Sequence, residues 1–128
     1  MKKANREQRG RLKLLRAVQE GDAVECKRLA KRYQIRLDEW GEPLRIACEN
    51  GLKAVVRVLL DRGASINQAK NDGATPLYIA CQNGHEAVVR VLLDRGASID
   101  QAENDGATPL FIASQKGHKA VVRVLLDR

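Results

Sequence analysis

The chain has 128 residues, of which 44% are hydrophobic, 30% are charged and only 3% are aromatic. This composition indicates one globular domain with an aliphatic core and excludes a disordered chain. No apolar segment approaches the roughly 18–20 residues of a membrane span, and the N-terminus is too polar for a secretion signal. Three cysteines without such a signal indicate free thiols in a reducing, intracellular compartment, either cytoplasm or nucleus.

The net charge of +7 is concentrated near the N-terminus. Residues 1–36 hold twelve Lys and Arg against four Asp and Glu, a balance of +8, whereas residues 37–128 have a balance of −1. A basic segment of this kind can attach a protein to nucleic acid, to an anionic surface or to the nuclear import machinery. It can also be a solvated leader with Leu12 and Leu15 turned inward. The lack of aromatic and base-reading motifs favours the solvated leader.

A 33-residue repeat organises the rest of the chain. Residues 72–104 read DGATPLYIACQNGHEAVVRVLLDRGASIDQAEN, residues 105–128 repeat the first 24 positions with four differences, and residues 39–71 match at 23 of 33 positions. Residues 14–33 are a divergent copy. We therefore predict one domain made of a basic extension (1–11), an N-terminal capping repeat (12–38), two full repeats (39–71 and 72–104) and a truncated fourth repeat (105–128).

Each repeat begins with the signals of a short helix. In residues 72–104, Thr75 has the chemistry of an N-cap and Pro76 stands at the first helical position, where its missing N–H costs nothing. The helix is predicted to end at Asn83 and Gly84. Its apolar stripe consists of small and medium side chains, namely Leu77, Ala80 and Cys81.

A second helix is predicted from about Glu86 to Asp94, ending before Gly96. Valine and leucine leave it apolar around most of its circumference, and a helix of under three turns is marginal alone. One unit therefore cannot bury its own apolar surface, whereas stacked copies can, which predicts a solenoid. Residues 97–106 are too short and polar for a third helix and are expected to form an extended or hairpin-like connector.

These residues resemble the ankyrin repeat. The 33-residue period, the G-x-T-P-L opening, the G-H before the second helix and the V-V-x-x-L-L-x-x-G-A-x-I tail match that family's pattern from about Leu12 to Arg128. The resemblance implies an all-α solenoid of stacked helix-turn-helix units with β-hairpin-like connectors. It also implies a non-enzymatic module whose concave face, made of connector tips and first helices, binds a partner protein or peptide.

The resemblance also implies which positions contact the partner. The connector tips carry Asp38, Glu39, Gly41, Asn71, Asp72, Ala74, Asn104, Asp105 and Ala107, and the ends of the first helices carry Glu49, Asn50, Gln82, Asn83, Gln115 and Lys116. The groove is expected to run from acidic near the N-terminus to neutral or slightly basic near the C-terminus.

Four further residues complete the predicted partner-binding set. The family usually has His after T-P-L, but this chain has Arg45, Tyr78 and Phe111, which are expected to line or border the groove in place of a polar bridge between repeats. Trp40 stands at a tip where the next repeats have glycine. It is either an anchor for the partner or a packing residue against the leader repeat.

The remaining chemistry-bearing residues favour structural roles. Cys48 and Cys81 are repeat-equivalent and roughly 10 Å apart, too far for a disulfide, so we interpret them as buried packing residues, with Cys26 the most exposed of the three thiols. His85 and His118 are expected to bond backbone groups between the two helices. The sequence contains no phosphate loop, no nucleophile or metal motif and no paired carboxylates, so we predict no catalytic residue, cofactor or metal.

The last repeat has no successor in the chain, which raises the question of its outer face. We expect hydrophobic side chains there to face outward, which predicts end-to-end self-association or a longer array; they are Val121, Val122, Val124, Leu125 and Leu126. A third functional hypothesis is a designed or recently duplicated scaffold with no specific function, because surface positions such as Arg90 and Arg123 hardly vary between copies.

Overall fold

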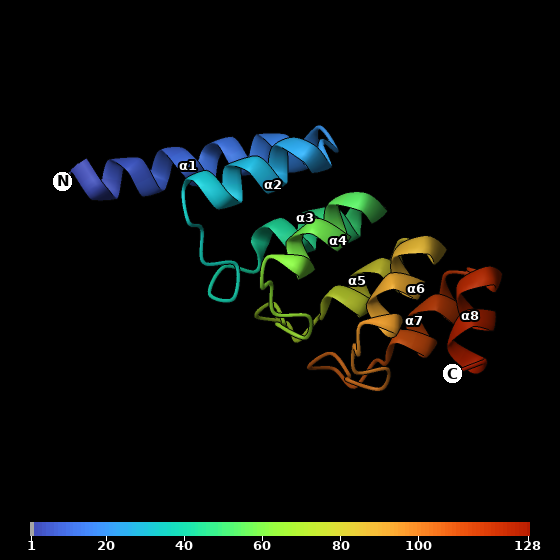
Figure 1. Ribbon diagram of the computed structural model, residues 1–128. Coiled ribbons are helices and arrows are strands. Elements are labelled where there is room, and N and C mark those ends of the chain that lie inside the picture. Colours follow the sequence, from blue (N-terminus) through green and yellow to red (C-terminus); the bar gives the residue numbers. More distant parts are fainter. Residues whose placement is uncertain (1) are drawn as a thin grey trace.

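The computed structural model describes residues 2–128, with side chains from residue 5 onward. Eight helices in this part of the chain form four antiparallel pairs that follow one another in a row (Figure 1). The pairs are α1 (Lys2–Gln19) with α2 (Ala23–Arg32), α3 (Glu42–Glu49) with α4 (Lys53–Asp61), α5 (Pro76–Gln82) with α6 (Glu86–Asp94), and α7 (Pro109–Gln115) with α8 (Lys119–Leu126). The predicted all-α solenoid is therefore confirmed.

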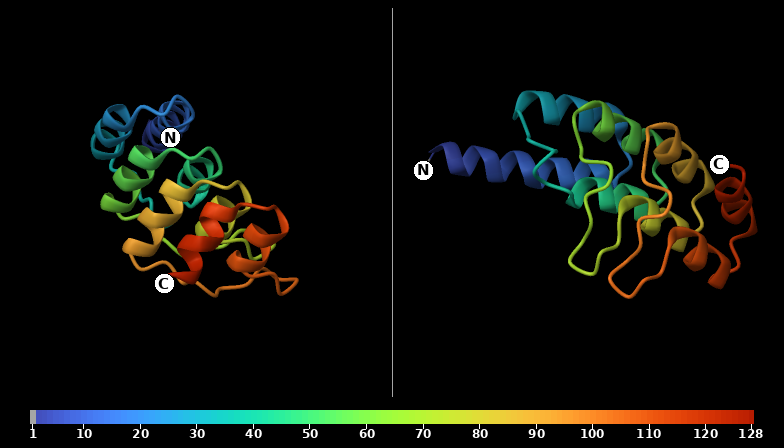
Figure 2. Two further views of the ribbon diagram at one scale, coloured as in Figure 1. Left: turned by 90° about the vertical axis from the view of Figure 1, so that its right-hand side faces the viewer. Right: turned by 90° about the horizontal axis from the view of Figure 1, so that it is seen from below.

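The connectors between pairs contain turns and, within residues 2–128, no strand. The two long connectors, residues 62–75 and 95–108, project to the same side of the row (Figure 2). Each tip closes on itself through two backbone bonds. Lys70 N donates to Ala74 O and Gly73 N donates to Lys70 O, both at 2.9 Å, and in the second connector Glu103 N donates to Ala107 O and Gly106 N donates to Glu103 O, both at 2.8 Å. The expected hairpin-like shape is thus produced by isolated bonds rather than by a ladder.

The first helices of the last two repeats begin as predicted. Thr75 Oγ1 accepts a hydrogen bond from Tyr78 N, and Thr108 Oγ1 accepts one from Phe111 N, both at 3.1 Å. Gly84, with a φ of +73°, lies just beyond the end of α5 in the left-handed region that glycine adopts without strain. Helix α6 has the bounds predicted from the sequence, and α5 begins at the predicted Pro76 but ends at Gln82, just before the predicted stop at Asn83 and Gly84.

Helix α1 is continuous through the predicted extension and into the first repeat. Its buried stripe is Leu14, Ala17 and Val18, at the i, i+3, i+4 spacing of one helical face. The expectation that Leu12 turns inward is wrong, because Leu12 lies two residues before Leu14, on the opposite side of the helix, and is 70% exposed.

Two aromatic side chains fasten α1 to the rest of the chain. The ring of Tyr33 lies so close to α1 that a Cβ at Gly10 would be 2.5 Å from its Cγ, so only glycine fits there. The guanidinium of Arg11 lies 4.8 Å from the centroid of the half-buried Trp40 ring. These contacts support the packing interpretation of Trp40.

The core is one continuous cluster between two layers of helices. The layer of α1, α3, α5 and α7 packs on the layer of α2, α4, α6 and α8, and each helix also packs on its counterpart in the next repeat. Leu44, Leu77 and Leu92 are fully buried members of this cluster. Burial of one such side chain is worth about 1.5–3 kcal/mol.

The outer face of the last repeat differs from the expectation. Val121, Val124 and Leu125 are buried rather than outward-facing, because their shared helical stripe points back toward the preceding repeat. Val122 is half-buried, and Leu126 is 67% exposed. The hydrophobic surface left open at this end consists of Leu126 together with Leu110 and Phe111 of α7.

Histidines bridge neighbouring repeats. His85 Nε2 donates to Glu49 O (2.7 Å) and His118 Nε2 donates to Gln82 O (2.9 Å), so each imidazole caps the first helix of the preceding repeat. The prediction that these histidines bond backbone groups is confirmed, but their acceptors lie in the repeat before rather than in their own loop. A polar bridge between repeats therefore exists although the T-P-L histidine is missing.

Ion pairs join the ends of the second helices. Arg95 Nη1 lies 2.7 Å from Asp61 Oδ1, and Arg128 Nη2 lies 2.7 Å from Asp94 Oδ1. All four side chains are largely exposed, so each pair contributes at most about 1 kcal/mol. Like the histidine bonds, each of these ion pairs joins one repeat to the next at an equivalent position.

All three cysteines are buried. The packing roles of Cys48 and Cys81 are confirmed, but the expectation of an exposed Cys26 is wrong, because Cys26 shares a buried stripe with Leu29 and Ala30. Burial raises the pKa of Cys81 to about 12 and, together with the charges of nearby carboxylates, that of Cys26 to about 11. The pKa of Cys48 is also raised by burial.

The glycine beneath each bridging histidine provides a test of repeat stacking. A Cβ at Gly84 would lie 2.6 Å from His118 Nδ1, whereas Gly117, at a similar φ of +74°, has no neighbour within 4 Å. We expect Gly117→Ala to cost about 1–2 kcal/mol from backbone strain alone. Gly84→Ala should cost about 1 kcal/mol more, because the histidine bond is also lost.

Urea unfolding of both variants measures the difference. Gly51→Ala is a second positive case, because Gly51 lies under His85 with the same geometry. Equal losses for Gly84→Ala and Gly117→Ala would show that the histidine contact contributes nothing.

The buried thiols predict a loss of stability at alkaline pH. Their pKa values are raised above the ordinary 9.0 in the folded protein, so the unfolded chain releases these protons first as the pH rises. The free energy of unfolding should therefore fall between pH 9 and about pH 11, by at most about 1.4 kcal/mol per thiol per pH unit. In a Cys48→Ser/Cys81→Ser variant the free energy of unfolding should fall less steeply with pH. Denaturant titrations at several pH values measure this fall, and an equal fall in the variant and the unchanged protein would contradict the prediction.

Candidate partner-binding site

The connector tips are rigid local turns. Asp72 Oδ1 accepts from Ala74 N and Asp105 Oδ1 accepts from Ala107 N, each at 2.9 Å. These carboxylates therefore hold the shape of their tips while the residues remain exposed to solvent. The sequence had placed all four of these residues at the tips, and the structure does so too.

The two long tips are also bonded to each other. Asn104 N donates to Asp72 O and Asn104 Nδ2 donates to Asn71 O, both at 2.8 Å. The backbone approach is tight, since a Cβ at Gly73 would be 2.7 Å from Asn104 N. Neighbouring tips thus form one connected rim.

Two adjoining hollows lie between this rim and the first helices. One, of about 380 Å³, is lined by Glu42, Arg45, Ile46, Glu49, Lys70, Ile79, Gln82 and Asn83. The other, of about 440 Å³, is lined by Arg45, Gln68, Ala69, Lys70, Asn71 and Asp72. Arg45 and Lys70 border both hollows, so they join them into one groove, which we call the α3–α5 groove.

The groove gathers six of the predicted partner-binding residues, namely Arg45, Glu49, Asn71, Asp72, Gln82 and Asn83. Sequence reasoning missed Glu42 and Ile46, although their helical spacing from Arg45 and Glu49 placed them on the same face. It also missed Lys70 and Gln68, which come from the connector. Asn104 and the last-repeat positions Asp105, Ala107, Gln115 and Lys116 lie outside this groove.

Two predicted contact residues are buried, so these predictions are wrong. Ala74 is 3% exposed and Tyr78 is 4% exposed, because each repeat is covered by the next one at these positions. Phe111, which is equivalent to Tyr78, is 54% exposed because no repeat covers it. Arg45 is half-buried, so Arg45, Tyr78 and Phe111 do not form a continuous row.

The first connector is a separate small turn. Arg36 binds Asp38 through two bonds, at 3.0 and 2.9 Å, and lowers the pKa of that carboxyl group. Asp38 O also accepts from Ser65 Oγ (3.1 Å), and Glu39 lies 3.5 Å from Arg36. The acidic side chains here are exposed but partly neutralised by one arginine.

The asparagines at the first-helix ends have local partners. Asn50 Nδ2 donates to Ile46 O (3.0 Å) and Asn83 Nδ2 donates to Ile79 O (2.8 Å), so both amides cap their own helices. Gln82 is exposed, as are Asn50 and Asn83.

Acidic charge continues along the rim. Burial raises the pKa of Tyr78, and the nearby carboxylates of Glu103, Asp105 and Asp72 raise it further. The pKa of Glu103 is raised by desolvation and by Asp105. The groove was expected to change from acidic to slightly basic toward the C-terminus. The tip of the connector 95–108 stays acidic instead, because Glu103 lies beside Asp105 there.

Metal binding and membrane insertion find no support in the described residues. In the part of the chain that the structure describes, no group of three or more His, Cys, Asp or Glu side chains is placed to hold a metal ion. None of the helices among residues 2–128 is both long and apolar enough to cross a membrane.

Comparisons with known proteins agree with this architecture. A family model described as ankyrin repeats in three copies matches residues 66–128, and one described as ankyrin repeat matches residues 42–68. Together these segments contain α3 to α8. No curated protein matches the chain. Ankyrin repeats are in general protein-binding modules and typically lack enzymatic activity. From its helix pairs, its 33-residue period and these matches, the chain belongs to the ankyrin repeat family.

Proposed function

We propose that the protein is a non-enzymatic binding module that holds a partner protein or peptide in the α3–α5 groove. The observation that carries this proposal is the junction at Arg45 and Lys70, where a helix face and a connector rim meet over two adjoining hollows. Concave surfaces of this kind, with a few polar groups above apolar side chains, are typical binding sites.

Rigidity supports the proposal. The rim is held by the bonds of Asn104 to the preceding tip and by the turn bonds of Asp72 and Asp105. A surface that is already ordered loses little conformational entropy when a partner binds, so more of the contact energy appears as affinity.

The charges of the groove indicate the chemistry of the partner. Arg45 and Lys70 stand at the junction, Glu42 and Glu49 flank them along α3, and the half-buried Ile46 supplies apolar surface. Lys70 Nζ lies 3.9 Å from Asp72 Oδ2, a weak pair that leaves the lysine accessible. A partner segment with a carboxylate at the junction and an apolar side chain beside it fits this pattern.

The cysteines and histidines are arranged for structural roles, which agrees with a binding module rather than an enzyme. The thiols are buried and their pKa values are raised, so they are protonated at neutral pH. His85 and His118 are committed to backbone carbonyls of the preceding repeats. Neither group forms the nucleophile–base pair that covalent catalysis needs.

The junction can be tested with a charge-matched pair of variants. Arg45→Gln/Lys70→Gln removes two positive charges from the groove, and Arg57→Gln/Arg123→Gln removes two from exposed positions on α4 and α8. We expect the groove variant to lose at least about tenfold in affinity for the partner, because charged contacts at an interface centre cost most when truncated. The control should bind as the unchanged protein does.

Affinity capture with quantitative mass spectrometry identifies the partner, and titration with the purified partner measures the loss. Thermal unfolding of both variants verifies that the repeats stay folded. Equal loss in both variants, or loss only in the control, would place the binding surface elsewhere.

A further inference from the structure

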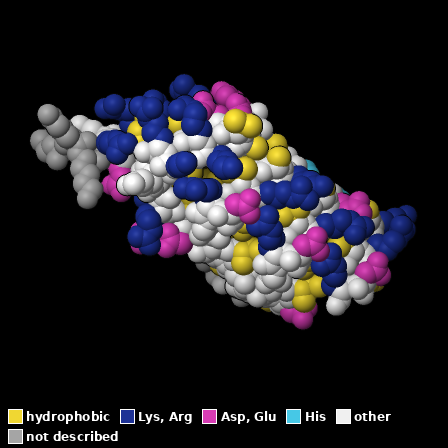
Figure 3. Space-filling model, viewed as in Figure 1, with side chains coloured by type: hydrophobic (Ala, Val, Ile, Leu, Met, Phe, Trp, Pro, Cys, Tyr) yellow, Lys and Arg dark blue, Asp and Glu magenta, His cyan; other side chains and the backbone are white. Residues whose placement is uncertain are grey.

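Helices α1 and α2 carry a run of cations that the α3–α5 groove does not use. Four of them lie on α1 at intervals of 3, 4 and 3 residues, which keeps them on one helical face, and two lie on the adjacent edge of α2. They are Arg6, Arg9, Lys13, Arg16, Arg28 and Arg32, all exposed, and we call them the basic strip. Figure 3 shows Lys and Arg side chains gathered over these two helices.

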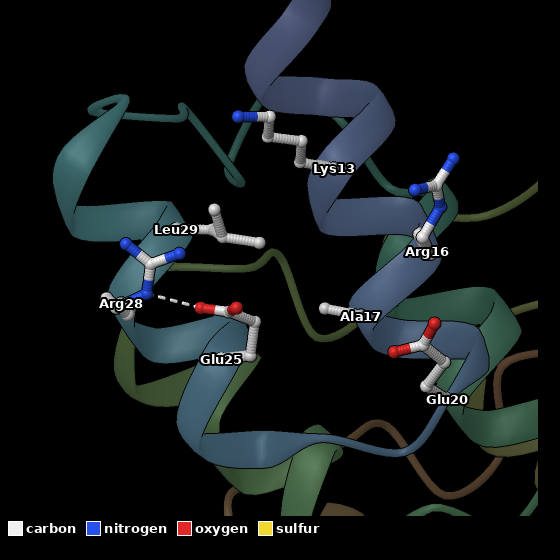
Figure 4. Close-up of a pocket in the computed structure, with 7 residues that line it drawn as sticks. All are labelled: Lys13, Arg16, Ala17, Glu20, Glu25, Arg28 and Leu29. Carbon is white, nitrogen blue, oxygen red and sulfur yellow. Dashed lines mark hydrogen bonds and ion pairs between the residues drawn. The ribbon is translucent and has the colours of Figure 1, made fainter.

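The strip lines two hollows between the helices. The outer one, of about 440 Å³, is bordered by Arg6, Arg9 and Arg32 together with Asn5 and Tyr33. The inner one, of about 260 Å³, is bordered by Lys13, Arg16 and Arg28, and also by Glu20 and Glu25 at the end near the α1–α2 turn (Figure 4).

Little in the protein neutralises this charge. Among the described residues, Arg28 is the one member of the strip that is paired with a carboxylate, that of Glu25. Arg6 donates to Arg32 O (3.0 Å), and Lys13 donates to Tyr33 Oη (3.2 Å).

Three cations surround a single aromatic ring. Arg6, Lys13 and Arg32 lie 5.4, 5.7 and 5.7 Å from the centroid of Tyr33. The ring attracts each of them, but it cannot cancel their mutual repulsion. The hydrogen bond from Lys13 also lowers the pKa of Tyr33. An anion beside the ring would relieve this repulsion.

The spacing of the strip matches a nucleic-acid backbone. Arg6 and Arg16 are ten residues apart on a straight helix, or about 15 Å. One strand of a duplex passes about four phosphates in that distance, at about 3.4 Å of axis each. We propose that the basic strip binds double-stranded nucleic acid through the phosphates of one strand, without reading its sequence.

A lipid surface fits the strip less well. Helices that lie on membranes need a continuous apolar face beside the cations. The apolar face of α1 is buried against the protein through Leu14, Ala17 and Val18, and Leu12 is the large hydrophobic side chain of α1 that is exposed among the described residues. Leu12 on α1 and Val24 on α2 are exposed, but two side chains on different helices do not make a continuous apolar face.

The experiment measures binding of the full chain to labelled DNA and RNA duplexes of about 20 base pairs by fluorescence anisotropy, over a range of salt concentrations. Neutralisation of about four phosphates should give a slope of log affinity against log salt of about −3.6, or a loss of about 150-fold for a fourfold rise in salt. Binding of either duplex with this dependence on salt supports the proposal. The duplex that binds more tightly is the form of nucleic acid that the strip prefers.

Two variants with equal changes in charge separate the strip from overall basicity. Arg9→Gln/Arg16→Gln removes two exposed cations and should make the slope of log affinity against log salt shallower by about 1.8. If the variant and the unchanged protein have equal affinities near 1 M salt, the variant should bind about 60-fold more weakly at 0.1 M. Arg57→Gln/Arg123→Gln should leave slope and affinity within about twofold. Thermal unfolding establishes that both variants are folded.

Several outcomes would overturn the proposal. They are an absence of duplex binding at low salt, equal effects of the two double variants, or tighter binding to phosphatidylserine vesicles or to polyglutamate than to either duplex. Because these residues lie outside the α3–α5 groove, the result does not depend on whether the proposed partner-binding function is correct.

Discussion

The structure depends on the inability of any one helix pair to bury its own apolar surface. The first helices of the last three repeats have seven or eight residues, and the second helices of these repeats carry valine and leucine around most of their circumference. Such pairs are stable only in register with a neighbour, so the row of helices, the rim of tips and the groove all follow from stacking. The polar bonds of His85 and His118 add direction to this otherwise apolar contact.

The fold was predictable from the sequence because its signals are local and repeated. A Thr-Pro start, an Asn-Gly end and the apolar stripe between them defined α5 to within a residue. The errors arose where a neighbouring repeat decides the outcome. Tyr78 has the polarity of a surface residue, but the next repeat covers it, whereas its equivalent Phe111 is exposed.

The site was predictable in part for the same reason. Positions on one helical face, such as Arg45 and Glu49, could be inferred from spacing, whereas Lys70 joins them only through the path of the connector. The basic strip shows the converse case. Its charge was evident from composition, but the convergence of Arg6, Lys13 and Arg32 on the Tyr33 ring depends on how α1 and α2 pack.

The near-identity of the last two repeats has a kinetic consequence. Residues 72–95 and 105–128 differ at four of 24 positions, so a folding chain can dock the wrong pair onto α3 and α4 and loop out the intervening segment. Among the described residues, the contacts of Gly10 with Tyr33 and of Arg11 with Trp40 near the N-terminus have no duplicate in the later repeats. During synthesis the N-terminal repeats emerge first, so each later repeat meets a docking surface that is already in place. Refolding of the complete chain lacks this order, and repeats docked in the wrong register then become kinetic traps.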